Sequence, residues 1–380
     1  MPDADRQAEI AEADRRGARL RTGALVVIAV GVVLVMLREA SFILSALVVA
    51  TILFSLASDA IAAVARLRVG RLHVPQWLAS LVALAMIALA LFTLTSLILA
   101  QINEVLGVTL AYAARAPEAT ADLFRWAGPE IEEAVLEAMR SLDLTGAFTR
   151  LASEAGDLMQ GAVLVILFVA FMFGERISYQ AKLRGLFGDR ARAAEARAVI
   201  GSIMHQVNHY LLVKTAVSAL TGALVFAASH AFGLTLAGAL ALVTFLLNYL
   251  PNLGSIAATL LAGLVAHVQF ADSGNTLAFV ALISAIQFGC GNVLDPYLTG
   301  RTLRLSTLGI LFSLAFWGAL WGVAGMFLSV PIMVAAMIVC SRSPRLRPIA
   351  VILSRDGLPD RRVHPAEAAD RPKAARTAAE

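Results

Sequence analysis

The sequence predicts an all-α protein that crosses a membrane several times, with about six full spans and two interrupted helical hairpins, or about eight to ten hydrophobic segments in all. Apolar residues make up 59% of the chain and charged residues only 15%, whereas a water-soluble protein is about half apolar and a quarter charged. The apolar residues are also clustered, since residues 215–271 and 305–341 contain no Asp, Glu, Lys or Arg. Because about 20 apolar residues cross the ~30 Å hydrocarbon core, the first run has room for nearly three crossings and the second for two short ones.

Three spans form the first membrane segment, residues 22–101, after a basic N-terminus of residues 1–21. We expect these spans over about 22–37, 40–58 and 75–101. The first run leads straight into the second without a small-residue cleavage site, so we interpret it as a retained helix and not as a signal peptide.

Residues 102–157 are too polar to cross a bilayer, because they contain ten acidic residues and four arginines. Apolar residues recur at helical spacing behind Pro129, at Ile131, Ala134, Val135, Ala138 and Met139. The segment is therefore predicted to be an amphipathic helical insertion on the extracytoplasmic side, packed against the bilayer or a sister subunit.

The segment 158–205 is predicted to contain a fourth span, over about 158–174, and a charged, helix-prone stretch that connects it to the core. The core, residues 206–340, begins with a fifth span over about 207–229 and includes a further span over about 276–294.

Each of these two core spans precedes a hydrophobic hairpin with a break in its middle. The first hairpin, 234–270, is interrupted at Asn248-Tyr-Leu-Pro-Asn-Leu-Gly254, and the second, 305–340, near Trp321-Gly322-Val-Ala-Gly325. Pro251 has no N–H, and backbone polar groups freed by such a break are tolerated at membrane depth only inside protein or beside a wet cavity. An ordinary surface loop between two full spans is the alternative.

Lys and Arg in the short loops set the orientation. The N-terminus, the loops 59–73, 175–205 and 295–304, and the tail 341–380 are basic, so they are predicted to face the cytoplasm from a bacterial inner membrane. The tail, rich in Arg, Pro and Ala, is expected to be disordered. The net charge of +4 and pI of about 9.4 follow from this topology and indicate no nucleic-acid partner.

The two hairpins resemble each other at a constant offset of 71 residues, at which Leu240, Phe245 and Gly254 match Leu311, Phe316 and Gly325. In the predicted topology the hairpins open to opposite sides of the membrane. Together these features indicate an inverted repeat, which is typical of many secondary transporters.

Three motifs in the core carry a resemblance to a known family: Phe245-Leu-Leu-Asn-Tyr-Leu-Pro-Asn-Leu-Gly-Ser255, Asn292-Val-Leu-Asp-Pro-Tyr-Leu-Thr-Gly300 and Phe316-Trp-Gly-Ala-Leu-Trp-Gly-Val-Ala-Gly-Met326. In their order and spacing the chain resembles, over about 20–340, the autoinducer-2 exporter family of bacterial membrane proteins. The resemblance implies an oligomeric secondary transporter or exporter, and some members are associated with sodium–proton exchange. Many relatives carry an acidic residue shortly before the proline that matches Pro296, whereas Asp295 is the only carboxylate near it in this sequence. Here Cys290 and Gly291 occupy that neighbourhood, which argues against cation coupling.

The candidate substrate-binding or gating residues are the polar, aromatic and turn residues of the core: Lys214, Ser218, Asn248, Pro251, Asn252, Gly254, Asn292, Asp295, Arg301, Trp317, Trp321 and Gly325. An ionisable residue within a span is a functional candidate, and amides can bind a polyhydroxylated solute. Each type also has a structural interpretation. The lysine can snorkel, asparagines can cap the broken helices, Ser218 and Thr221 can bond preceding helical carbonyls, Asp295 can form an interfacial pair with Arg301, and tryptophans can sit in the interfacial belt.

These residues favour an exporter of a small polar solute, uncharged or weakly anionic, such as the quorum-sensing signal autoinducer-2. A monovalent cation/proton antiporter and a membrane scaffold without transport are the alternatives. The sequence contains no zinc, nucleophile-elbow or phosphate-loop motif, so we expect no enzyme, catalytic residue, metal or cofactor. The expected partners are the lipid bilayer, a small polar solute or monovalent ion, and further copies of the chain in a homo-oligomer.

Overall fold

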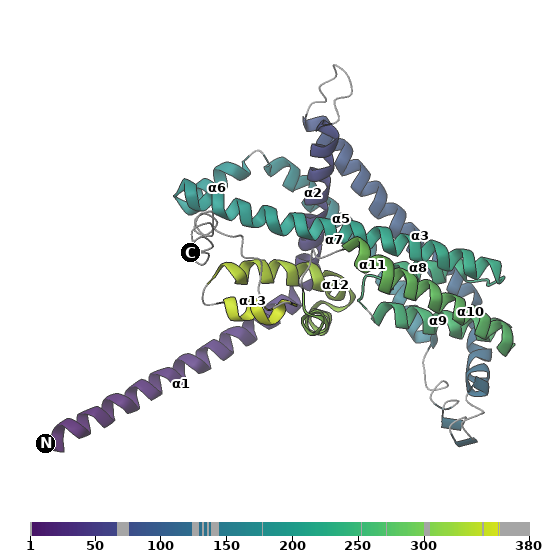
Figure 1. Ribbon diagram of the computed structural model, residues 1–380, viewed down its shortest axis with the longest axis horizontal. Helices are drawn as coiled ribbons and strands as arrows, with labels where there is room; N and C mark the ends of the chain where they lie inside the picture. Colours follow the sequence, from purple (N-terminus) through teal and green to yellow (C-terminus); the bar gives the residue numbers. More distant parts are fainter. Residues whose placement is uncertain are drawn as a thin grey trace, which may run out of the picture.

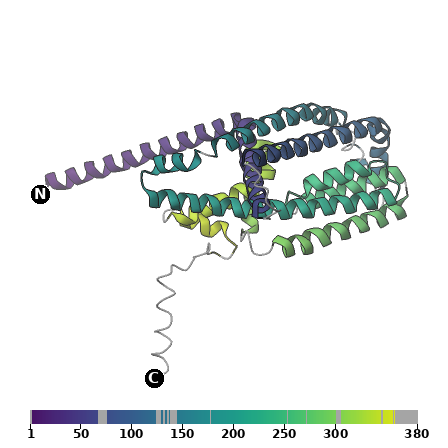
Figure 2. The same cartoon turned by 90° about the horizontal axis from the view of Figure 1, so that it is seen from above.

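A computed structural model shows a helical protein, as the composition predicts (Figures 1 and 2). It describes residues 2–66, 76–123, 129–130, 133–134, 137, 144–176, 178–251, 253–270, 272–299, 305–343, 346–355 and 357. Within these ranges, eight helices are long and apolar enough to cross a membrane, and one shorter apolar helix accompanies them. The prediction of an all-α chain with several apolar spans is thereby confirmed.

The N-terminal half contributes four long helices: α1 (Pro2–Glu39), α2 (Ser41–Arg66), α3 (Gln76–Leu123) and α5 (Leu144–Glu175). α1 extends away from the rest of the protein as the purple helix in Figure 1, and its apolar stretch is not buried against other helices. α2 and α5 pack together through small and branched side chains, at Ala46, Ala50, Val165 and Val169, with α3 against them.

The insertion expected at 102–157 is built partly by extension of its two flanking spans. α3 continues beyond its apolar run to Leu123, and α5 begins before its apolar run at Leu144. The polar residues at these two ends therefore extend the flanking helices. Most of the residues between them, including most of the predicted amphipathic stripe, lie outside the described residues.

The charged segment after α5 forms α6 (Tyr179–Phe187) and the first turns of α7 (Arg190–Ala231). Asp189 caps α7, because its side chain accepts a hydrogen bond from the Ala191 N–H at 3.0 Å. At 1.5 Å per residue, the 42 residues of α7 extend about 63 Å, roughly twice the hydrocarbon thickness. The fifth span is therefore one part of a helix that begins well before the apolar run.

The α7 helix packs beside α8 (Ala237–Leu247) and α10 (Ser273–Phe288), and α9 (Leu253–Phe270) packs against both of these. They are the teal and green helices that run alongside one another in Figure 1. Their shared core contains Val225, Ala228, Leu234, Leu240, Ala262, Ala266, Phe279 and Ile283. The interruption predicted within 234–270 is present between α8 and α9, where α8 ends with Asn248 as its C-cap.

The end of the span predicted at 276–294 has a feature that the sequence did not indicate. α10 passes into a π-helix, η2 (Gly289–Leu294), followed by the short helix α11 (Asp295–Thr299). π-Helical turns inside α-helices occur frequently at functional sites, because they shift the direction of the side chains that follow them.

The α12 helix (Thr307–Arg342) contains the second predicted interruption, since Gly322 has φ 61° and ψ −141° inside it. The hydroxyl of Ser313 donates to the Ser329 carbonyl at 2.9 Å. In a straight helix these residues, 16 positions apart, would be separated by about 24 Å. The chain therefore turns back on itself at Gly322. Only glycine readily adopts the positive-φ backbone conformation found there.

The segment expected to be a disordered tail begins with a helix, α13 (Arg347–Leu353). α13 packs on α12, and the Ser306 N–H donates to the Leu353 carbonyl at 2.8 Å. Leu305 and Ser354 also form an isolated antiparallel β-bridge. Buried apolar side chains of α2, α7, α12 and α13 form a common core around Val207, Val334 and Ala350, which explains why this segment is ordered.

Candidate functional site

A pocket of about 310 Å³ lies where the first hairpin break meets α7, the end of α10 and the two arms of α12. It lies along α7 between the core shared with α12 and the core shared with α8, α9 and α10. Five of the twelve residues predicted from the sequence line it: Lys214, Asn248, Pro251, Asn292 and Asp295. The sequence therefore identified five of the sixteen lining residues but not their geometry.

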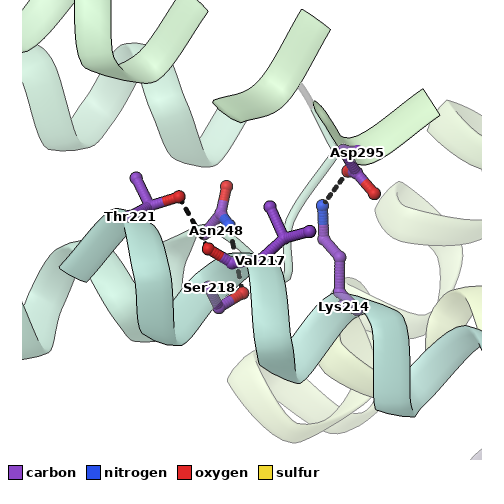
Figure 3. A network of polar contacts seen from close by, with 6 residues as sticks. All are labelled: Lys214, Val217, Ser218, Thr221, Asn248 and Asp295. Atoms are coloured by element: carbon purple, nitrogen blue, oxygen red, sulfur yellow. Dashed lines mark hydrogen bonds and ion pairs between the residues drawn. The ribbon is translucent and has the colours of Figure 1, made fainter. Parts of the chain in front are cut away.

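Lys214 and Asp295 form an ion pair at the wall of the pocket (Figure 3). The lysine Nζ lies 2.6 Å from an Asp295 carboxylate oxygen, and the two side chains are only 7% and 20% exposed. Lys214 is therefore held inside the protein and does not extend away from it, as a snorkelling side chain would. The pair joins α7 to the first residue of α11 and neutralises a charge that would be costly to bury alone.

Asp295 was predicted to pair with Arg301, which lies outside the described residues, so that contact stays a prediction. The lysine partner had no sequence signal, because the two residues are 81 positions apart. The π-helix directly before Asp295 is the local feature that sets where this carboxylate points.

Asn248 connects the break in the first hairpin to α7. Its amide nitrogen donates to the Ser218 hydroxyl oxygen at 3.0 Å, and both residues are buried (Figure 3). The neighbouring Tyr249 hydroxyl lies 2.7 Å from that of Thr215, also on α7. Thr221 instead donates to the Val217 carbonyl at 2.8 Å, as the structural interpretation predicted. Two side-chain contacts thus hold the non-helical backbone against one helix.

We expect Ser218→Ala to lower the free energy of unfolding by about 1–3 kcal/mol, because it leaves the buried Asn248 amide without its acceptor. Ser229→Ala is the matched control on the same helix. Ser229 is equally buried, and its hydroxyl has no hydrogen-bond partner among the described residues. Thermal unfolding of the purified variants should therefore show a loss for Ser218→Ala and none for Ser229→Ala. Equal losses would contradict the assigned contact.

The other predicted residues that the structure describes are not part of the pocket lining. The rings of Trp317 and Trp321 contact each other at a tilt of 54° with centroids 4.7 Å apart, and the Trp321 indole N–H donates to the Leu37 carbonyl of α1 at 2.9 Å. Gly254 and Gly325 serve the two turns, since a Cβ on either would overlap a backbone carbonyl oxygen of the preceding arm. Asn252 lies outside the described residues.

The pocket also contains residues that the sequence analysis missed: Tyr210, Ser255, Gln287, Thr307 and Arg355. Two of them carried a usable signal. Tyr210 precedes Lys214 by one helical turn on the same face, and Gln287 is a polar residue near the end of an apolar helix. Arg355 carried none, because only the packing of α13 brings it to the pocket. Among the described residues, no three His, Cys, Asp or Glu side chains cluster as metal ligands would.

Comparison with known proteins identifies the family. The sequence profile of the AI-2E family transporters matches residues 23–345, which is most of the chain and includes every pocket residue except Arg355. The chain belongs to the AI-2E transporter family. This confirms the resemblance drawn from the three core motifs and makes the protein a member of a family of membrane transporters.

Individual AI-2E relatives agree with this assignment. The chain is 32% identical to the AI-2 transport protein TqsA of Escherichia coli K12 over 292 residues, which is 75% of this chain and 83% of TqsA. It is 29% identical to a "Putative transport protein" of Haemophilus influenzae over 74% of this chain and 82% of that protein. A "Putative transport protein" of Borreliella burgdorferi is 30% identical over 54% of this chain and 57% of its own length.

Proposed function

We propose that this protein is a secondary transporter of a bacterial inner membrane that exports a small polar solute, uncharged or weakly anionic, through the pocket at the first hairpin break. The observation that carries the proposal is the composition of that pocket. Amide side chains and a mutually neutralised Lys214–Asp295 pair line it, inside a body of apolar helices. In a membrane protein, polar groups gathered at a helix break are typical of a substrate pathway.

The two interrupted hairpins support a mechanism of alternating access. Both contain a turn in which a glycine Cβ would overlap the preceding arm, at Gly254 and Gly325, and these glycines are 71 residues apart, the offset of the predicted repeat. The hairpins also touch near their breaks, with the rings of Tyr249 and Phe327 5.4 Å apart. We propose that they are re-entrant halves of an inverted repeat that rock against each other around the pocket.

Autoinducer-2 is the first substrate to test, because TqsA is named as its transport protein. We expect proteoliposomes that contain the purified protein and unlabelled autoinducer-2 to accumulate the labelled compound by counterflow. Protein-free liposomes are the control. Inside-out membrane vesicles should accumulate the compound if the direction is export. No counterflow with autoinducer-2 or other small neutral solutes would contradict the proposal and favour a scaffold without transport.

Cation–proton antiport is the competing activity within the family. Asp295 is the single carboxylate among the described residues that line the pocket, and it is already paired with Lys214. Lys214 and Arg355 line the same pocket, and two cationic side chains beside one carboxylate disfavour a bound cation, so this pocket suits a neutral or weakly anionic solute better. Sodium-dependent collapse of a pH gradient, followed with a pH-sensitive dye in the same proteoliposomes, would reverse this preference.

A further inference from the structure

Gln287 is a buried polar side chain at the pocket whose amide group does not help to hold the described part of the fold together by hydrogen bonds. It lies in the last turn of α10, is 5% exposed, and lines the pocket. Neither its amide nitrogen nor its amide oxygen has a hydrogen-bond partner among the described residues. An unpaired buried polar group costs about 1–3 kcal/mol, so a leucine in its place would be better for folding alone.

Two other buried polar side chains at this wall are already paired. Lys214 is bound to Asp295 at 2.6 Å, and Asn248 is bound to Ser218 at 3.0 Å. Gln287 therefore has both a free donor group and a free acceptor at the same place. The amide atoms of Gln287 are covered in this conformation, so its side-chain torsions must rotate before the amide can contact a solute. A solute bound in that way supplies the hydrogen bonds that the amide lacks.

We propose that Gln287 is the residue that selects the transported solute, and that it selects a neutral molecule carrying hydroxyl groups; this rests on the transport function proposed above. A hydroxyl both donates and accepts, so it satisfies both halves of the amide. A carboxylate or phosphate only accepts and leaves the amide oxygen unpaired, whereas an ammonium only donates and leaves the amide nitrogen unpaired. A site built to hydrogen-bond a hydroxyl discriminates strongly against analogues that lack it.

The test compares Gln287→Leu with wild type and with Gln269→Leu as a matched control. Gln269 is a paired amide away from the pocket, which accepts from the Thr235 N–H at 2.9 Å and donates to the Gly233 carbonyl at 2.7 Å. The unfolding temperature of each purified protein is measured alone and with autoinducer-2 or D-ribose as neutral hydroxylated probes and D-ribonate as an anionic probe. A ligand that binds the folded state raises this temperature.

Without a probe, we expect Gln287→Leu to unfold at the wild-type temperature or above it and Gln269→Leu to unfold below it. A neutral probe should raise the unfolding temperature of wild type and Gln269→Leu, and Gln287→Leu should lose at least nine-tenths of that rise. An equal rise in Gln287→Leu, a larger rise with D-ribonate in wild type, or no rise with either neutral probe would overturn the inference. If Gln287→Leu still shows counterflow at the wild-type rate, only the role of Gln287 is overturned. If binding depends on Gln287 but the wild-type protein shows no counterflow, only the transport function is overturned.

Discussion

Gly254→Ala and Gly325→Ala are each expected to destabilise the protein by about 3 kcal/mol or more, the upper part of the range for overpacking. A Cβ at Gly254 would overlap the Leu247 carbonyl oxygen, and a Cβ at Gly325 would overlap that of Trp317. A flexible side chain could move away, but these atoms are backbone of the opposing hairpin arm. Relief therefore requires opening of the turn, and the turn at Gly254 adjoins the wall of the pocket.

Gly201→Ala is the control for this prediction, because nothing lies within 4 Å of the Cβ that it would add on α7. Alanine is favoured over glycine inside a helix by about 1 kcal/mol, so this variant should be as stable as wild type or more so. Unfolding temperature and the fraction of monodisperse protein after detergent extraction measure both effects. Wild-type values for Gly254→Ala and Gly325→Ala would show that the hairpin arms do not approach as closely as described.

Composition was sufficient to predict the spans, because hydrophobic thickness sets a length that can be counted along a sequence. It could not predict where helices end. α7 begins at Arg190, well before its apolar run. Outside the bilayer, charged residues such as Arg and Glu favour the helix about as strongly as Leu does. Helix α13 was missed for a related reason, because its order comes from packing on α12 and not from its own composition.

The breaks were predictable from single residues, whereas the pocket needed three-dimensional information. Pro251 and the glycines of the second break have backbone properties that act locally. The partner of Lys214, by contrast, depends on a π-helix for which apolar periodicity gives no signal. The contact of Trp321 with the Leu37 carbonyl of α1 likewise had no sequence signal, because the two residues are 284 positions apart.

Removal of either member of the Lys214–Asp295 pair should have the other large effect. Lys214→Met removes the cation that faces the partly buried Asp295 carboxylate, and Asp295→Leu leaves the Lys214 ammonium buried without the carboxylate that lies 2.6 Å away. Breaking a buried pair in this way costs about 3–5 kcal/mol. We expect a cost at the lower end of this range because the Asp295 side chain is still 20% exposed. Thermal unfolding of each single variant measures this loss.

The double variant Lys214→Met/Asp295→Leu separates structure from transport. Replacing both members of a buried pair with apolar residues is often neutral or stabilising, so its unfolding temperature should return to near that of wild type. Counterflow should nevertheless stay below about one-tenth of the wild-type rate, a barrier increase of at least 1.4 kcal/mol, because the pocket loses the two charged groups that keep its wall hydrated for a polar solute. Full recovery of counterflow in the stable double variant would mean that the pair serves only to hold α11 against α7, and the solute path would then have to be sought elsewhere in the protein.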